Sequence, residues 1–504
     1  MATTKTRHAT STGPSEFGWR RRGGGYTSPM NVEAAPEWEG STVQVCGLWP
    51  WTTGSSIPTV GAPLGGHLMS GATVCADPVG WFTNRLANTP SGFVLGHPGL
   101  GKSSLVRRMM TGMADRGVWP LVLGDVKPDY PPLIRKLGGQ VITLSRGEGR
   151  MNPLDLMGAW GELASLPAEV RRWAASTLLG SQLNVLTGLV TLVRGTGGQV
   201  ADHEATMLSQ TLRALQLADD DTALPGPPPT IRDVLRMIQS RDRRLMLAAL
   251  VSDDISDEAK ARADYDEATL PLRRSLRALL ADGPFGGIFD GPTQTHMQIN
   301  RPVVFDMHDL NAADDVMRAA VQLVCWVYGS TCTALSNEMA DYQLIPRTHY
   351  CLVMDELWQI LKANPYMVER VNEITRLNRQ MGIGQIMCTH TMNDLRMGDD
   401  RLTDIAFGFV ERSSMVFLGG LADSEFGNLE TAFLLSQREK TLLTDWSVEA
   451  QIDPTTGRGT APPGRGHFLL KLGKRPGIPF VVRLTPAEMR VNDTNTRWDE
   501  LAVA

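Results

Sequence analysis

Cysteine is scarce in this sequence, and its six positions form neither a disulfide framework nor a zinc motif. No two cysteines stand at the CxxC spacing that is typical of zinc and redox sites. The thiols are scattered along the chain, at Cys46, Cys75, Cys325, Cys332, Cys351 and Cys388. We therefore expect free thiols in a reducing cytosol and no disulfide-stabilised fold.

The sequence also lacks long apolar runs and an excess of positive charge. No run reaches the roughly eighteen apolar residues that a membrane-spanning helix requires, and residues 1–25 hold no apolar segment of a signal peptide. The formal net charge is −5, so the chain has no overall basic character that would indicate nucleic-acid binding. We expect a cytoplasmic protein with no transmembrane segment of its own, which could dock peripherally at the inner face of the cell membrane.

The clearest motif in the chain is a phosphate-binding loop. The stretch GHPGLGKS, residues 96–103, has the spacing GxxxxGK[ST] and stands between an apolar strand and a helix. Its glycines let backbone N–H groups turn around a phosphate, its lysine would contact the β- and γ-phosphates, and its serine would bind Mg²⁺. We therefore predict ATP and Mg²⁺ as cofactors. The nucleotide-binding residues are expected to be Gly96, His97, Pro98, Gly99, Leu100, Gly101, Lys102, Ser103 and Ser104.

A second apolar strand, residues 351–354, ends in the carboxylates Asp355 and Glu356. With strand and helix patterns between it and the loop, this arrangement is typical of P-loop enzymes. In that chemistry Asp355, together with Ser103, would hold Mg²⁺, and Glu356 would polarise the attacking water. The simpler alternative is that Asp355 only caps the helix that follows.

Alternating strand and helix patterns around these motifs predict an α/β fold with a mainly parallel sheet. Residues 119–124 form a near-continuous apolar run, as expected of a strand that is buried on both faces. After residue 160 the strand-like runs give way to leucine, alanine and arginine at helical spacing, which predicts an all-helical insertion. The expected parts are a disordered basic tail (1–25), a short β-rich segment (26–91, with a strand at 43–48), the first part of a RecA-like ATPase core (92–158), the all-α insertion (159–290), the second part of the core with a C-terminal β-hairpin (291–485), and a C-terminal tail (486–504).

The strand after the carboxylate pair ends in Thr389 and His390. Because polar residues at the carboxyl ends of parallel strands meet at the nucleotide-binding edge, we expect these two beside the γ-phosphate as a sensor of hydrolysis. A purely structural hydrogen-bonding role for the histidine is equally open.

Two arginines, Arg376 and Arg379, stand three residues apart on a helix predicted over 362–381. In an oligomeric ATPase such arginines could stabilise the transition state in the site of a neighbouring subunit and so act as catalytic residues. They could equally belong to a solvated helix face. Arg412, which precedes another predicted strand, is a second candidate.

Taken in order, these motifs resemble those of the FtsK–HerA superfamily of P-loop ATPases, and most of all the conjugation ATPases of type IV secretion systems, of the VirB-four or TraC-like type. The likeness spans roughly residues 60–485 and rests on GHPGLGKS, DVKPDY, LGGQVITL, NPLD, CLVMDELW and TRLNRQMGIGQIMCTHTMNDL. It implies a RecA-like core that acts as a homo-hexamer or a similar ring. It also implies membrane-embedded channel proteins of the secretion or conjugation apparatus as partners, with DNA as a further candidate.

The sequence departs from that family in two places. About 90 residues precede the loop, so we do not expect the family's usual large N-terminal domain within this chain, and a separate chain could supply it. The sensor strand ends in Thr389-His390, where the family often has Thr-Gln. Both departures bear on the transport role more than on the ATPase chemistry.

Three functions are open at this point. The first is an ATP-hydrolysing motor of a conjugation or type IV secretion system, powering DNA or protein transfer or assembly of the transfer apparatus. The second is a DNA translocase or coupling-type ATPase of the same superfamily. The third is a nucleotide-binding scaffold without hydrolysis, against which the intact Lys102, Ser103, Asp355 and Glu356 argue.

Overall fold

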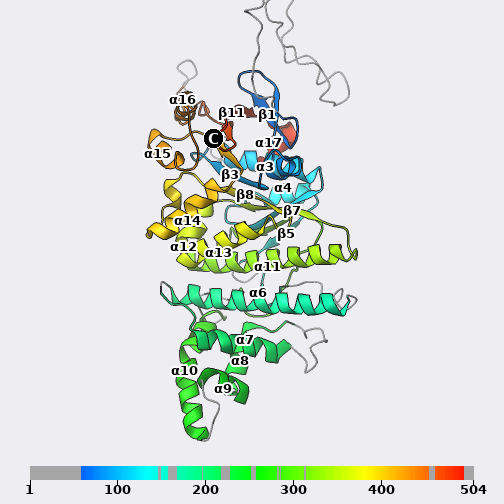
Figure 1. Cartoon of the computed structure of the whole chain (residues 1–504), viewed down its shortest axis with the longest axis vertical. Coiled ribbons are helices and arrows are strands. Elements are labelled where there is room, and N and C mark those ends of the chain that lie inside the picture. The colour runs from blue at the N-terminus through cyan, green and yellow to red at the C-terminus, as the bar shows by residue number, and fades with distance from the viewer. Residues whose placement is uncertain are drawn as a thin grey trace, which may run out of the picture. The chain divides into compact units, whose positions relative to one another are not determined.

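A large twisted sheet, parallel in its centre, organises the structure, a computed structural model of the chain (Figure 1). The described residues are 58–145, 149–156, 167–195, 197–216, 228–250, 257–280, 283, 285, 287–310, 314–452 and 460–492. The predicted basic tail, the strand at 43–48 and most of the C-terminal tail lie outside them. Within the described residues the sheet has eleven strands, in the order β2 (Thr73–Cys75), β1 (Pro63–His67), β11 (Ile478–Val482), β10 (His467–Lys471), β9 (Met415–Leu418), β3 (Ser91–Leu95), β8 (Ile383–Cys388), β7 (His349–Met354), β4 (Val118–Asp125), β6 (Val303–Asp306) and β5 (Gln140–Thr143).

The strands from β9 to β5 run parallel to one another, and the four on the β10 side are antiparallel. The prediction of an α/β fold with a mainly parallel sheet is confirmed. The hairpin predicted near the C-terminus is present as β10 and β11, and it joins the sheet beside β9.

Helices cover both faces of the parallel strands because those strands are buried on both sides. In β3, Phe93 and Leu95 belong to one apolar core, whereas Val94 between them belongs to the other. Neighbouring residues of a strand point to opposite faces, so an unbroken apolar run requires a cover on each face. Long α11 packs on β4 within the first core, and α3 packs on β4 within the second.

The helices of the sheet-bearing part follow the predicted βα pattern with one exception. They are α2 (Pro78–Thr83), α3 (Lys102–Ala114), α4 (Pro131–Lys136), α11 (Asp315–Asp341), α12 (Leu357–Ala363), α13 (Pro365–Leu377), α14 (Asp400–Glu411), α15 (Phe426–Leu429), α16 (Gln437–Asp445) and α17 (Pro486–Asn492). The prediction of a single helix over 362–381 is wrong. Asn364 is extended and its side chain accepts a hydrogen bond from Tyr366 N–H, so one helix ends and a second begins at Pro365.

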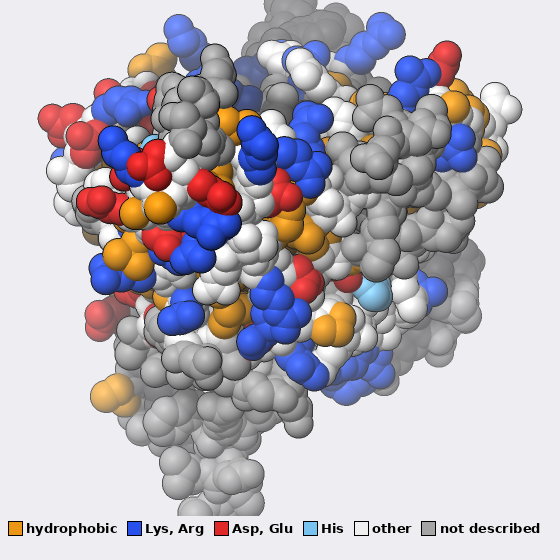
Figure 2. Space-filling model, turned by 90° about the horizontal axis from the view of Figure 1, so that it is seen from below, with side chains coloured by type: hydrophobic (Ala, Val, Ile, Leu, Met, Phe, Trp, Pro, Cys, Tyr) orange, Lys and Arg blue, Asp and Glu red, His pale blue; other side chains and the backbone are white. Residues whose placement is uncertain are grey.

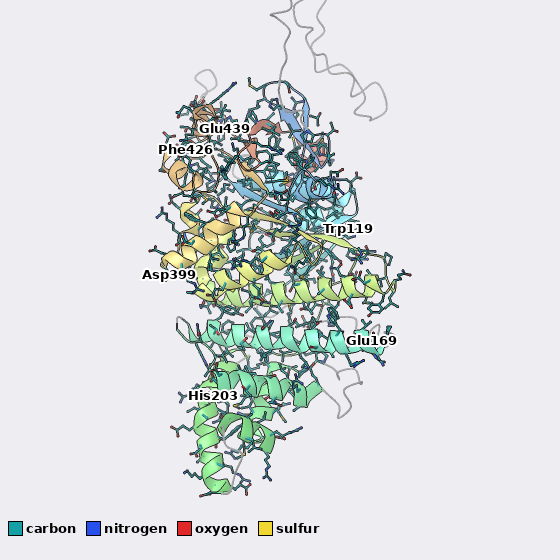
Figure 3. The ribbon with its side chains drawn as sticks, in the orientation of Figure 1. Trp119, Glu169, His203, Asp399, Phe426 and Glu439 are labelled. Carbon is teal, nitrogen blue, oxygen red and sulfur yellow. The ribbon has the colours of Figure 1, made fainter. Side chains whose placement is uncertain are left out.

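Between β5 and β6 the regular elements of the described chain are all helices. The helices are α6 (Ala168–Arg194), α7 (Asp202–Gln216), α8 (Ile231–Gln239), α9 (Arg243–Leu250) and α10 (Glu258–Ala278). The first of them packs along α11, and Figure 3 shows side chains in the space between the two ribbons, with Glu169 in the first turn of α6. Where an all-α insertion begins and ends in the chain stays a prediction.

One helix of the described chain, α6, is long and apolar enough to cross a membrane by length and composition. The sequence prediction concerned unbroken apolar runs, and α6 is not one, since Gln182 and Asn184 interrupt it. Its apolar window is 44% buried within the protein, against helices such as α11 and α7. Gly188 of α6 lies so close to Leu323 of α11 that an added Cβ would stand 2.6 Å from the Leu323 side chain.

Candidate functional site

The phosphate-binding loop connects β3 to α3 at the carboxyl edge of the parallel strands. Gly99 and Gly101 have φ values of 79° and 95°, in the left-handed region that favours glycine. Gly101 is also the N-cap of α3, and no side chain caps this helix. The first N–H groups of α3 therefore remain available to an anion such as a nucleotide phosphate.

The loop is anchored to neighbouring segments by backbone hydrogen bonds. Gly96 N–H donates to the carbonyl of His390 at 3.0 Å, and His97 N–H donates to that of Gly420 at 3.0 Å. Gly466 N–H donates to the carbonyl of Leu100 at 2.9 Å. The sequence predictions missed Gly420 and Gly466, although Gly419-Gly420 stands directly after an apolar strand, which is the usual signal for this edge.

Lys102, the lysine of the motif, is buried and points back into its own loop. Its ammonium donates to the carbonyls of Gly96 at 2.7 Å and His97 at 3.2 Å, and to Nδ1 of His390 at 2.8 Å. Burial lowers the pKa of Lys102, and the negative charges of Asp355 and Glu356 oppose that shift only in part. A phosphate in the loop would offer this ammonium stronger, charged acceptors.

Ser103 and Asp355 come together as predicted, with the serine hydroxyl 3.3 Å from Oδ2 of the carboxylate. Adjacent ligands of an octahedral Mg²⁺ are about 3 Å apart, and this ion is commonly held by one or two protein oxygens plus phosphates and water. The two oxygens therefore fit Mg²⁺. Tyr130 OH donates to the same Oδ2 at 2.7 Å and fixes the carboxylate, a contact that sequence reasoning did not find.

Glu356 is surrounded by donors. Lys127 forms an ion pair with Oε1, and Oε2 accepts from Trp358 Nε1 at 2.7 Å and lies 3.1 Å from Nε2 of His390. Burial alone would raise the pKa of Glu356, but the hydrogen bonds from His390 and Lys127 outweigh it and hold the pKa well below its ordinary value. The backbone here is left-handed, with φ 50°, which is uncommon for a residue other than glycine.

The DVKPDY segment follows β4 and supplies further groups to the same edge. Asp125 accepts a hydrogen bond from Tyr130 N–H at 2.9 Å, and burial raises the pKa of Asp125 well above its ordinary value. Asp129 lies 3.9 Å from the guanidinium of Arg107 on α3. The end of an apolar strand predicts that this segment lies at the nucleotide-binding edge, but the contacts of Lys127 and Tyr130 with the two carboxylates are not predicted by the sequence.

Thr389 and His390 lie beside the loop. Thr389 N–H donates to the carbonyl of Val94 at 3.1 Å, and its buried hydroxyl oxygen has no hydrogen-bond partner among the described residues. The histidine contacts both Lys102 and Glu356 through its two ring nitrogens. The placement suits a sensor, and the role itself stays a prediction.

The arginines lie at the other edge of the sheet, at the amino ends of β3 and β8. Arg376, Arg379 and Arg412 line a cavity of about 330 Å³ there. Arg376 and Arg412 both donate to Oδ1 of Asn372, at 3.2 and 2.9 Å. Arg379 lies beyond the end of α13 and stacks on Phe82 at 5.6 Å, so the two arginines predicted to share one helix do not.

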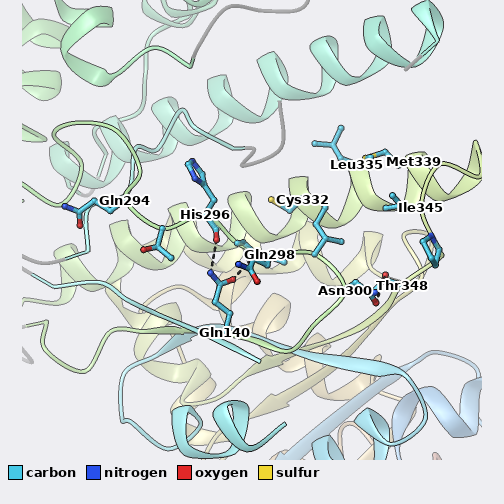
Figure 4. A pocket seen from close by; sticks show the side chains of 14 residues that line it. Gln140, Gln294, His296, Gln298, Asn300, Cys332, Leu335, Met339, Ile345 and Thr348 are labelled. Carbon is cyan, nitrogen blue, oxygen red and sulfur yellow. Dashed lines mark hydrogen bonds between the residues drawn. The ribbon is translucent and has the colours of Figure 1, made fainter. Parts of the chain in front are cut away.

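A second cavity, of about 640 Å³, lies far from the loop along the strands, where β5 and β7 begin (Figure 4). Gln140, His296 and Asn300 form its polar side, and Leu335 and Met339 of α11 form part of its apolar side. No Lys, Arg, Asp or Glu is among its lining residues in the described chain. Its described lining therefore offers no charged group to the phosphates of a nucleoside triphosphate.

Comparison with known proteins supports the fold. No family model matches the sequence, and no curated protein matches it. The solved structure of VirB4 of Thermoanaerobacter pseudethanolicus matches with a TM-score of 0.62 at 19% identity, covering 86% of this chain and 100% of that one. The bacterial conjugative coupling protein TrwB aligns with a TM-score of 0.43 in its complex with ADP and Mg²⁺, at 12% identity over 79% of this chain and 85% of that one.

The likeness to the VirB4 structure confirms the fold that the motifs predicted, a RecA-like P-loop ATPase fold.

Proposed function

We propose that the protein is an ATP-hydrolysing motor. The observation that carries this proposal is the meeting of four groups from distant parts of the sequence at one edge of the sheet. Lys102 and Ser103 follow β3, whereas Asp355 and Glu356 follow β7, with only β8 between these strands. The serine hydroxyl and the Asp355 carboxylate are in hydrogen-bond contact.

In this proposal each group has one task. Lys102 and the N-terminus of α3 bind the phosphates. Ser103 and Asp355 hold Mg²⁺, which when bound neutralises charge on the β- and γ-phosphates. Glu356 accepts a proton from the attacking water. Thr389 and His390, at the end of β8 between the two groups, sense the γ-phosphate.

We further propose that copies of the chain act as a ring, with a homo-hexamer as the expected form. Arg376, Arg379 and Arg412 lie at the amino ends of strands whose carboxyl ends carry the loop. A strand of five residues is about 16 Å long, so these arginines are out of reach of the chain's own γ-phosphate. A head-to-tail arrangement brings the two different edges of neighbouring copies together, and closed head-to-tail arrangements are rings.

The type of machine is proposed from the fold and the motifs together. The VirB4 structure shares the fold over 86% of this chain. We propose a motor of a conjugation or type IV secretion system, which powers DNA or protein transfer or assembly of the transfer apparatus. Its place would be cytoplasmic, at the inner face of the membrane, with membrane-embedded channel proteins as partners.

A coupling-type DNA translocase is the second candidate. Among the described residues on the face seen in Figure 2, Lys and Arg side chains are interspersed with Asp and Glu, so these residues offer no unbroken basic surface to a phosphate backbone. This observation favours the secretion motor.

Turnover measurements separate the candidates. We would measure ATP hydrolysis with and without single- and double-stranded DNA, together with the mass of the protein in the presence of ATP. Turnover that DNA leaves unchanged supports the secretion motor, and strong stimulation by DNA supports the translocase. A protein that binds ATP without turnover would be the nucleotide-binding scaffold, and the proposal would be wrong.

A further inference from the structure

Three turns that are far apart in the sequence meet at the end of the sheet where β1 and β11 pair. They are the β1–β2 turn (68–72), the β10–β11 turn (472–477) and the N-cap with the first two residues of α16 (436–438). Leu68 N–H donates to the carbonyl of Pro479 at 3.0 Å, and the guanidinium of Arg438 donates to Sδ of Met69 at 3.4 Å. Figure 1 shows β1, β11 and α16 beside one another.

The β10–β11 turn is held from the inside by a buried ion pair. Lys471 donates to Oε1 of Glu439 at 2.8 Å and to the carbonyl of Arg475 at 2.9 Å. Gly477 N–H donates to the same Oε1 at 2.7 Å, so one carboxylate joins α16 to the turn. The exposed side chains of these turns therefore project from a fixed framework.

The exposed side chains at this place are apolar or positively charged. Leu68 and Met69 are 37% and 66% exposed, and Arg438, Lys474 and Arg475 are exposed as well. The three turns contain no Asp or Glu. Within the part of the chain that the structure describes, none of these three cations forms an ion pair. We call these five side chains the basic tip.

Apolar side chains among unpaired cations match the surface of a bilayer that carries anionic lipids. The headgroups attract the cations, and leucine and methionine side chains can enter the boundary between headgroups and acyl chains. The chain as a whole has a formal net charge of −5. Attraction to an anionic membrane therefore has to come from a local group of cations such as this one.

Other macromolecules match the basic tip less well. A stable protein–protein interface takes about 800 Å² and about 20–30 residues from each partner, whereas the tip is formed by a few side chains on three turns. Single-stranded nucleic acid is commonly bound by stacking its bases on aromatic side chains, and the three turns contain none. A lipid surface needs only shallow insertion of a few side chains.

We propose that the basic tip docks the protein on anionic lipid headgroups, with Leu68 and Met69 inserted at the membrane surface. This inference rests on the proposed function for the place at the inner face of the membrane, and it names the surface that faces the lipid. Four strand spacings separate β1 from β3 in the sheet, or roughly 19 Å, so a change at the tip does not touch the phosphate-binding loop. In a ring, several tips would bind one membrane together and strengthen a weak individual contact.

The test is sedimentation of the full chain with lipid vesicles. Vesicles of phosphatidylcholine alone are compared with vesicles in which part of this lipid is replaced by phosphatidylserine. One variant, Lys474→Gln with Arg475→Gln, removes two cations of the tip. Its matched control, Arg135→Gln with Lys136→Gln, removes an adjacent and exposed arginine and lysine on α4. A further variant, Met69→Ser, removes an apolar side chain of the tip without changing the charge.

We expect the unmodified protein to bind the phosphatidylserine vesicles, less tightly as salt is added, and to bind phosphatidylcholine alone much more weakly. Each cation near an anionic surface contributes about a fivefold gain in affinity, so the variant with two tip cations removed should bind about 25-fold more weakly. The α4 control should bind within about twofold of the unmodified protein. Met69→Ser should also bind more weakly. Urea unfolding verifies that each variant is folded without requiring turnover.

The outcomes separate the docking from the proposed function. If the unmodified protein binds neither kind of vesicle, or both equally, the docking proposal is wrong whatever the ATPase activity. It is also wrong if the tip variants bind as tightly as the α4 control. If vesicles are not bound and the tip variants instead change the mass of the assembly, the tip is a contact between copies. If binding follows the tip and ATP is not hydrolysed, the docking stands and the motor is wrong.

Discussion

Gly101→Ala isolates the contribution of the loop's backbone conformation. The residue has a φ of 95°, and an added Cβ would lie no closer than 3.6 Å to its nearest neighbour, Gly466 N. No steric clash is therefore expected. The loss of folding stability comes from the left-handed conformation, which costs about 1–2 kcal/mol for a residue with a Cβ. If the loop relaxes to relieve this strain, one of its N–H groups turns away from the phosphates. A lost charge-assisted hydrogen bond of about 1.5–3 kcal/mol corresponds to at least a tenfold loss of affinity.

Gly117→Ala is the matched control. Gly117 has a φ of 77° in the turn between α3 and β4, and nothing lies within 4 Å of an added Cβ there. Urea denaturation should therefore show a similar loss of stability for both variants. Titration with a fluorescent ATP analogue should show a loss of affinity for Gly101→Ala alone. If Gly101→Ala bound the nucleotide as tightly as the unmodified protein, the assignment of this turn as the phosphate cradle would be refuted.

Three further predictions concern catalysis and stability. Glu356→Gln should bind ATP normally but lose at least a hundredfold in kcat, because an amide cannot accept the proton; rapid turnover would reassign the base. A mixture of Lys102→Ala chains with Arg379→Ala or Arg412→Ala chains should recover part of the ATPase activity, and no recovery with either would count against action in a neighbouring subunit. Glu488→Gln should cost about 2 kcal/mol at pH 7, since this carboxylate binds Arg108 of α3 at 2.7 Å. Burial raises the pKa of Glu488, but the hydrogen bonds from Arg108 and neighbouring groups outweigh burial and hold the pKa below 4.5, the value in the unfolded chain. The stabilisation of the folded state by this carboxylate is therefore present above pH 4.5 and is lost as the pH falls below it. If urea unfolding showed the same loss of stability for Glu488→Gln at pH 7 and at pH 3, this prediction would be contradicted.

Much of the fold could be read from local patterns. The run of apolar residues in β3 predicts a strand covered on both faces, and the glycine spacing after it predicts a turn around phosphate. The break at Asn364-Pro365 was missed because apolar periodicity continues through it. A proline directly after an asparagine is nevertheless a recognised start of a helix, and that signal would have divided the predicted helix correctly.

Within the site, the sequence predicts only the contacts between residues of its recognised motifs. The meeting of Ser103 with Asp355 follows from the rule that the carboxyl ends of parallel strands share an edge. The contacts of Lys127 and Tyr130 could not be predicted, because they depend on how the loop after β4 folds back over β7. The position of the arginines at the opposite edge follows from the same rule, because Arg379 and Arg412 stand just before the parallel strands β8 and β9.

The central claim is hydrolysis of ATP at the loop, and the most direct measurement is the steady-state release of phosphate by the purified protein beside its Lys102→Ala variant. The ammonium of Lys102 is buried in the loop and has no substitute there among the described residues, the exposed Lys127 being paired with Glu356. We predict Mg²⁺-dependent turnover by the unmodified protein and none above background for the variant. Equal turnover by the two proteins would contradict the account.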